Sequence, residues 1–227
     1  MGIPSGYAER REVWRRDCGS LLQAAGVPYK FVVGWPVSPG RDLTKHQQGV
    51  FASDEEAAKA SEMRRESEQY GDMHFIAVPD TYLDLQAKSY AIFQHGYALG
   101  ATYVVKLDDD GCVDVPKLQS ALEEHEKRPG RELYAGYHRW EGTEMRQMRG
   151  RAGEPHPYMS GPLYLLSREL IRLIMDEDRA NTVLWAAYGS FDEDAQMGKW
   201  VAFAQKKHNV TVDYQVIPGL RMASGFK

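Results

Sequence analysis

The chain has 227 residues, 43% of them hydrophobic, and its 28 Lys and Arg residues against 32 Asp and Glu residues give a formal net charge of -4. This composition predicts a folded protein with enough apolar surface for a core, and the length fits one domain over residues 1–227. The mild acidity argues against a dedicated nucleic-acid binder, and the lack of a long apolar run predicts no membrane contact.

The first half of the chain predicts helices that alternate with short strands. Residues 1–5 stand where a first strand is expected. We then expect a helix over residues 8–25, a strand over 29–33, a loop over 36–50, a charged helix over 54–70, a strand over 74–78, a helix over 85–99 and a strand over 103–107.

The second half continues this alternation. We expect a helix from Pro116, strands over residues 133–137 and 163–166 around a polar loop over 140–157, a helix after Ser167, a last helix from Glu193 and a closing strand over 210–214. The alternation predicts an α/β fold, Rossmann-like, with a mostly parallel central sheet flanked by helices. Ligands bind such sheets beyond the carboxyl ends of the strands, so we expect the functional site there.

Asp108, Asp109 and Asp110 directly follow the third apolar strand. Adjacent carboxylates repel one another, and a bound cation relieves that repulsion. Asp108 and Asp110 point to the same side of an extended chain, and their oxygens suit Mg²⁺ or Mn²⁺. A solvated Asp-Asp-Asp-Gly turn is the alternative. An EF-hand calcium loop is excluded, because Lys106 and Lys117 stand at its first and twelfth positions.

A divalent ion beside acidic strand ends commonly holds a diphosphate, the group that sugar nucleotides carry. Basic residues could meet the phosphate oxygens: Arg10, Arg11, Arg15 and Arg16 cluster on the first expected helix, and Lys88 lies near the start of another. A solvated helix face explains these cations equally well.

Glu193 and Asp194 stand at the start of the last expected helix. The helix dipole favours acidic residues there, so a capping role explains them. A carboxylate in this position could also act as a general base that takes the proton from an attacking hydroxyl. Both interpretations stay open at this point.

Cys18 and Cys112 are the only cysteines of the chain, and their spacing matches neither a zinc site nor a disulfide scaffold. Two buried free thiols and a single disulfide both fit. We favour the free thiols slightly.

The order of short motifs resembles that of glycosyltransferase family 31, the β-1,3-galactosyltransferase and fringe group. The matching blocks are residues 10–15 (Arg-Arg-Glu-Val-Trp-Arg), 31–34 (Phe-Val-Val-Gly), 66–72 with 80–89 (Glu, Tyr-Gly-Asp, then Asp-Thr-Tyr-Leu-Asp-Leu-Gln-Ala-Lys-Ser), 106–110 (Lys-Leu-Asp-Asp-Asp), 158–167 (Tyr-Met-Ser-Gly-Pro-Leu-Tyr-Leu-Leu-Ser) and 193–198 (Glu-Asp-Ala-Gln-Met-Gly). These blocks fall in the family's order and span most of the chain.

This resemblance implies a GT-A type fold and an inverting, Mn²⁺-dependent transfer, with Mg²⁺ as a substitute. The donor would be UDP-galactose or UDP-N-acetylglucosamine, and the acceptor a hydroxyl of a glycan or glycoprotein, in β-1,3 linkage. The roles carried over are Asp194 as catalytic base, Asp110 with Asp108 on the metal, Asp108 and Asp109 facing ribose and sugar, Arg11, Arg15 and Lys88 on the nucleotide side, and Gly161, Tyr164 and Glu193 on the acceptor side.

The chain departs from the family pattern at three points. Cys18 stands where the family usually has Trp, and Pro162 replaces a Gly. Family members often add a His near the C-terminus as a metal ligand, and only His208 follows Asp194 here. The resemblance implies the Golgi lumen and a catalytic domain trimmed of its N-terminal anchor, whereas a complete chain would be cytoplasmic.

Two other functions compete with a transferase. A binding module for carbohydrate or nucleotide would keep the fold without turnover, and a metal-dependent nucleotide-sugar hydrolase would use Asp194 to activate water. The block over residues 158–167 favours the transferase, because it resembles acceptor-side structure that the other two functions do not need. The sequence gives no indication of the oligomeric state.

Overall fold

The computed structural model describes residues 1–36, 53–140, 156–180, 192–217 and 219–222. The helices and strands, in chain order, are β1 (Gly2–Pro4), α1 (Ala8–Trp14), η1 (Arg15–Gly19), α2 (Ser20–Ala24), β2 (Lys30–Trp35), α4 (Asp54–Tyr70), β3 (Met73–Pro79), η2 (Tyr82–Asp84), α5 (Leu85–Ala98), β4 (Tyr103–Leu107), β5 (Gly111–Val113), α6 (Val115–Glu126), β6 (Glu132–Gly136), β7 (Arg139–Trp140), β8 (Tyr158–Met159), β9 (Leu163–Ser167), α8 (Arg168–Ala180), α10 (Glu193–His208), β10 (Val212–Val216) and β11 (Leu220–Met222).

Seven strands of the described residues form one sheet in the order β10-β6-β9-β4-β1-β2-β3. β1 to β4 run parallel to one another, as do β6 and β10, whereas β9 runs antiparallel to β4 and β6. The predicted α/β fold with a mostly parallel sheet is therefore confirmed. Because β9 is reversed, its first residue, Leu163, pairs with the last residue of β4, Leu107.

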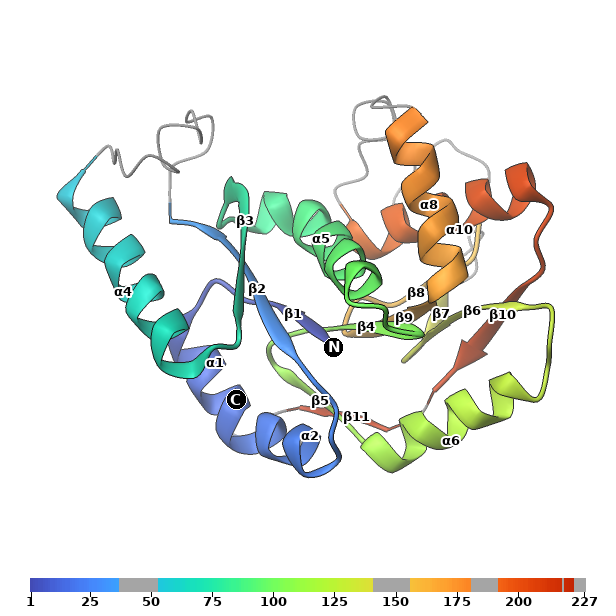
Figure 1. The fold of residues 1–227 in the computed structure, drawn as a ribbon, viewed down its shortest axis with the longest axis horizontal. Helices are drawn as coiled ribbons and strands as arrows, with labels where there is room; N and C mark the ends of the chain where they lie inside the picture. Colours follow the sequence, from blue (N-terminus) through green and yellow to red (C-terminus); the bar gives the residue numbers. More distant parts are fainter. Residues whose placement is uncertain (37–52, 141–155, 181–191, 218, 223–227) are drawn as a thin grey trace.

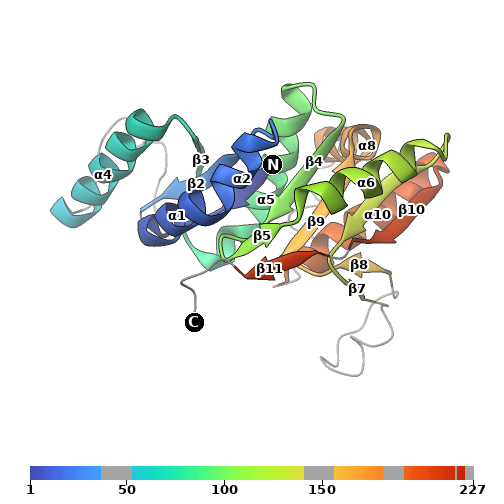
Figure 2. The same cartoon turned by 90° about the horizontal axis from the view of Figure 1, so that it is seen from below.

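Helices cover both faces of the sheet (Figure 1). One face packs against α1, η1, α2, α4 and α6, in a core that includes Trp14, Phe31 and Leu118. The other face packs against α5, α8 and α10, in a core that includes Phe93, Leu170 and Val201. Figure 2 shows α2 and α6 lying across the first of these faces. The two apolar layers fix the sheet from both sides, so that its strand ends hold side chains in defined positions.

The helix expected over residues 8–25 is divided in the structure. A π-helical turn, η1, separates α1 from α2. Such a turn carries an extra residue and shifts the faces of the helix that follows.

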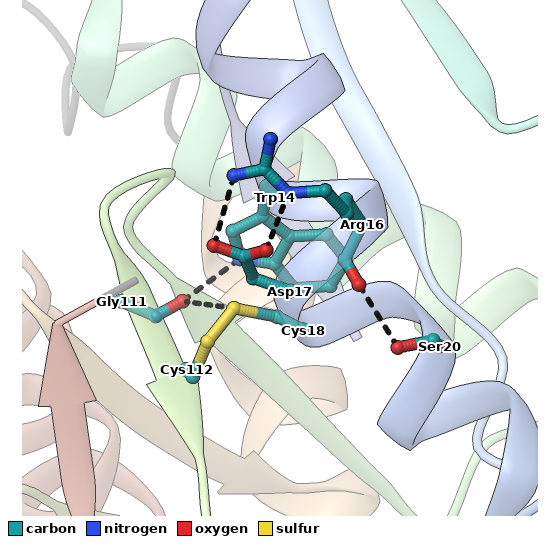
Figure 3. Close-up of a disulfide and its surroundings, with 7 residues drawn as sticks. All are labelled: Trp14, Arg16, Asp17, Cys18, Ser20, Gly111 and Cys112. Carbon is teal, nitrogen blue, oxygen red and sulfur yellow. Dashed lines mark hydrogen bonds and ion pairs between the residues drawn. A yellow bond between two sulfur atoms is a disulfide. The ribbon is translucent and has the colours of Figure 1, made fainter. Parts of the chain in front are cut away.

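The two cysteines are bonded to each other, so the preference for free thiols was wrong. Cys18 in η1 and Cys112 in β5 form a disulfide across a sequence separation of 94 residues, with their Cα atoms 5.4 Å apart. Figure 3 shows the bond beside Trp14, whose indole N–H donates to the carbonyl of Gly111 at 2.8 Å. Spacing along the chain carries no information on this pairing, since tertiary packing brings η1 and β5 together.

The other predicted elements occur within a residue or two of their expected ends. Ser53 caps α4 by accepting a hydrogen bond from the Glu56 N–H, and Gly71 ends the helix with a φ of 64°. Most of the loop expected over residues 36–50, and most of the loop expected over 140–157, lies outside the described residues. Within the described ranges, no helix is both long and apolar enough to cross a bilayer.

Candidate active site

A cavity of about 480 Å³ lies at the edge of the sheet where β1, β3 and β4 end and where β9 and α10 begin. Figure 1 shows these strand and helix ends meeting beside α5. The predicted site residues that line the cavity are Lys88, Asp108, Asp109, Asp110, Gly161, Glu193 and Asp194. The three aspartates that follow β4 therefore share one cavity with the carboxylate expected to act as the base.

Two of the three aspartates have partners within the chain. Asp109 is buried, and its carboxylate accepts hydrogen bonds from the Ser5 hydroxyl and from Arg10 Nη1, both at 2.8 Å. Asp108 is partly exposed and forms an ion pair with the buried ammonium of Lys106. These contacts balance two of the three adjacent negative charges.

Asp110 is different, because no other side chain of the described residues donates a hydrogen bond to its carboxylate. Burial raises the pKa of Asp110, and the charges of Asp108 and Asp109 raise it further against the opposing effect of Arg10. A half-buried carboxylate beside two others fits a hard divalent cation. Such an ion commonly takes one or two protein carboxylates and completes its shell with water and substrate phosphates.

Among the residues that the structure describes, no histidine joins these carboxylates. The described residues contain no cluster of three or more His, Cys, Asp or Glu side chains that could hold a metal ion. His208, considered above as a further ligand, is the last residue of α10 and lies roughly 20 Å along that helix from Asp194. Asp110, with Asp108 beside it, is thus the candidate protein ligand for an ion at this edge.

Asp194 lies in the first turn of α10, with its carboxylate fixed by two backbone donors. The Gly161 N–H donates to Oδ2 at 3.0 Å, and the Ala195 N–H donates to Oδ1 at 2.7 Å. Gly161 lies in the turn that leads into the antiparallel strand β9. The position of this strand therefore brings the Gly161 N–H to Asp194. A fixed carboxylate on a cavity wall is the arrangement that proton abstraction requires.

Glu193 and Tyr164 form a buried pair behind Asp194. The Tyr164 hydroxyl donates to Glu193 Oε1, and Lys106 Nζ lies 3.5 Å from Glu193 Oε2. Burial raises the pKa of Glu193, and Lys106 and Tyr164 offset part of this shift. Tyr164 has no exposed surface. Contact of this pair with an acceptor stays a prediction, whereas its support of the start of α10 is visible in these contacts.

Lys88 lines the cavity from α5 and is already paired. Its ammonium contacts the carboxylate of Asp80, which also accepts from the Gly34 N–H at 3.3 Å. Asp80 follows β3 and lines the cavity as well. A nucleotide contact by Lys88 would add to this pair rather than replace it.

Arg11 and Arg15 are not among the residues that line the cavity. Arg11 is 1% exposed and donates to both carboxylate oxygens of Glu66 in α4, and Arg15 pairs with Glu66 and Asp72. These contacts fix α1 and η1 against α4. Of the four arginines in this cluster, Arg10 lines the cavity. The nucleotide role of Arg11 and Arg15 stays a prediction, whereas their structural role is visible in these contacts.

The fold and the cavity agree with comparisons to known proteins. A family model described as galactosyltransferase matches residues 49–204. The chain belongs to the galactosyltransferase family. The resemblance to glycosyltransferase family 31, inferred above from the ordered motifs, is thereby confirmed, and the observed sheet is consistent with a GT-A fold.

Plant galactosyltransferases resemble the chain over most of its length. Hydroxyproline O-galactosyltransferase GALT5 of Arabidopsis thaliana is 33% identical over 68% of this chain and 23% of its own length. Probable beta-1,3-galactosyltransferase 5 of the same plant is 24% identical over 88% of this chain and 50% of its own length. The chain therefore spans between about a quarter and a half of these curated relatives.

Several cavity residues of this galactosyltransferase-family chain were not predicted as site residues. They are Ser5, Tyr7, Asp80, Tyr82 and Lys106, which line the cavity or bind its aspartates. Lys106 had a sequence signal, because a charged residue inside an apolar strand needs a buried partner. Arg10 was predicted as part of the basic cluster on the first helix. Arg11 and Arg15 stand at i and i+4 on one face of that helix, and Arg10 points in another direction.

Proposed function

We propose that the chain is an inverting galactosyltransferase that moves galactose from UDP-galactose to a hydroxyl of a glycan or glycoprotein. The observation that supports this most is the shared cavity, which Asp108, Asp109, Asp110 and Asp194 all line. A single in-line displacement needs a leaving-group site and a base on opposite sides of the anomeric carbon.

Asp194 would take the proton from the acceptor hydroxyl as that oxygen attacks. Its two backbone hydrogen bonds keep the carboxylate oriented before the substrate arrives. Such preorganisation contributes to rate because no group must reorganise during the reaction.

On the donor side, Asp110 with Asp108 would bind Mn²⁺, or Mg²⁺ in its place. When bound, the ion would neutralise charge on the diphosphate of the departing UDP. Arg10 lines the same cavity and would add a cation toward the phosphates, while Asp109, held by Ser5 and Arg10, would accept hydrogen bonds from ribose or sugar hydroxyls.

The relatives favour galactose over N-acetylglucosamine as the donor sugar, because the family model and the curated relatives are all named for galactosyl transfer. One of these names specifies hydroxyproline oxygen as the acceptor, and the other specifies a β-1,3 linkage. The acceptors to test are therefore a hydroxyproline peptide and a sugar with a free 3-hydroxyl, for which a terminal galactoside serves as the probe.

The Cys18–Cys112 disulfide supports a location in the secretory pathway, including the Golgi lumen. Disulfides form and persist in oxidising compartments and are rare in the cytosol.

A radiolabelled transfer assay tests the proposal. The full chain is incubated with Mn²⁺ and either UDP-galactose or UDP-N-acetylglucosamine, with the hydroxyproline peptide, the galactoside or no acceptor. We expect galactosylated product only with UDP-galactose, acceptor and metal. Free galactose without glycosylated acceptor would establish a hydrolase instead, and UDP binding without either product would establish a binding module.

A further inference from the structure

One buried ammonium connects three parts of the candidate site. Lys106 lies in β4 with 1% of its side chain exposed. Its ammonium hydrogen-bonds to Asp108 and to the Gly161 carbonyl and forms an ion pair with Glu193. These partners belong to three separate segments. The first segment follows β4 and contains Asp108, Asp109 and Asp110, the donor-side aspartates. The second is the turn before β9, and the third is the first turn of α10. The roles proposed above for Asp108 and Asp194 do not explain why the ammonium of Lys106 should contact all three segments.

Two hydrogen bonds through Gly161, in the turn before β9, connect Lys106 to Asp194. Lys106 Nζ donates to the Gly161 carbonyl at 2.6 Å, and the N–H of the same Gly161 donates to Asp194 Oδ2 at 3.0 Å. The next carbonyl, of Pro162, accepts from the Asp108 N–H at 3.0 Å. Lys106 therefore fixes the residue whose backbone orients the proposed base.

The contact with α10 acts on the residue beside the base. Lys106 Nζ lies 3.5 Å from Glu193 Oε2, and both side chains are buried. A buried carboxylate without a cation would be costly, so Lys106 permits Glu193 to stay beneath the helix start. Since Glu193 precedes Asp194 directly, its position limits where the Asp194 carboxylate can lie.

We infer that Lys106 is a positioning residue that holds Asp194 at a fixed place relative to the donor-side aspartates, through Gly161 and Glu193. This inference rests on the proposed role of Asp194 as the base. We assign Lys106 no contact with the acceptor, since its ammonium is paired with protein oxygens. An arginine is not equivalent, since its planar guanidinium cannot direct three donors tetrahedrally from one nitrogen.

The exchange rate of the Gly161 amide hydrogen tests the inference without an activity assay. The full chain is labelled with ¹⁵N-glycine, and exchange is followed by NMR in wild type, Lys106→Met and the double variant Lys106→Met/Glu193→Gln. The double variant removes both buried charges, so it is expected to fold even where the single variant does not. Lys117→Met, which removes a surface lysine paired with Asp114, is the matched control.

We expect the Gly161 amide to exchange at least about tenfold faster in the Lys106 variants, because the turn that holds it loses its anchor. The amides of Gly71 and Gly100, which hydrogen-bond elsewhere, should change less than about threefold. Equal rates for Gly161 in wild type and in the double variant would overturn the inference.

Kinetics of the same variants separate positioning of the base from donor binding. We expect kcat to fall at least about 30-fold while the Kd for UDP with Mn²⁺, measured by calorimetry, rises less than about fivefold. A Kd that rises as much as kcat falls would mean that Lys106 serves the donor through Asp108 alone, which contradicts the inference. If wild type transfers no sugar, the proposed function fails. The exchange rate of the Gly161 amide still shows whether Lys106 holds the turn that contacts Asp194.

Discussion

Among the single residues of the cavity, Asp194 carries the sharpest prediction. Asp194→Asn keeps the size of the side chain and an oxygen for the Gly161 N–H, but it removes the ability to accept a proton. We expect kcat to fall by about 10²–10⁴-fold, the usual contribution of a general base. The Kd for UDP should stay within about threefold, because the proposed base acts on the acceptor hydroxyl and not on the nucleotide. Unchanged turnover in the variant would reduce Asp194 to a helix-capping residue.

Asp110 should control the effect of metal on nucleotide binding. In wild type, we expect Mn²⁺ to tighten UDP binding, and chelation with EDTA to remove that gain. Asp110→Asn should weaken UDP binding in Mn²⁺ by about tenfold or more, because one carboxylate ligand is lost where few are available. Calorimetry of UDP binding with and without Mn²⁺ measures this directly.

Asp114→Asn is the matched control for that experiment. Asp114 caps α6 by accepting from the Lys117 N–H, and Asn performs the same capping role. An equal loss of Mn²⁺-dependent binding in both variants would show that general negative charge, rather than Asp110, attracts the ion.

Between elements, the disulfide joins η1 to β5 immediately after the donor-side aspartates. Replacing both Cys18 and Cys112 with Ser should lower the free energy of unfolding by about 2–4 kcal/mol, because the crosslink closes a long loop in the unfolded chain. Urea unfolding with and without dithiothreitol checks this. The reductant should destabilise wild type and leave the double variant unaffected, and a reductant effect on both would contradict the assignment.

A second contact between elements predicts a dependence of stability on pH. His74 of β3 and His95 of α5 stack with ring centroids 4.2 Å apart. Burial lowers the pKa of both histidines, and the charge of Lys30 lowers it further. The unfolded chain therefore binds more protons, and stability is lost as pH falls through the unfolded value of 6.5 toward the lower folded values.

We expect Tm to fall by a few degrees between about pH 7.5 and 5.5 for this reason. His95→Phe keeps an aromatic ring in the stack and removes one titrating group, so its Tm should fall less over this range. Differential scanning calorimetry measures both slopes, with His208→Gln as a control from the far end of α10. Identical slopes for His95→Phe and wild type would reject the role of this pair.

The complete sheet shows which features a sequence can reveal. The apolar strand before Asp108 and the acidic start of α10 are local patterns, and both gave correct elements. The direction of β9 in the sheet cannot be predicted from its own residues. All five are buried, and a continuous apolar run fits a parallel or an antiparallel strand equally well. The partners of Arg11 and of Cys18 are likewise set by packing between elements. The π-helical turn that carries Cys18 is also not revealed by the periodicity of the sequence.

The site gathers side chains from Ser5 to Asp194, with β9 inserted between strands made earlier. Asp110 and Asp194 are 84 residues apart in the chain. At about 5–20 residues per second, a ribosome completes Asp194 roughly 4–17 seconds after Asp110. For that interval the nascent polypeptide carries the carboxylates proposed to bind the metal but lacks Asp194, the proposed base.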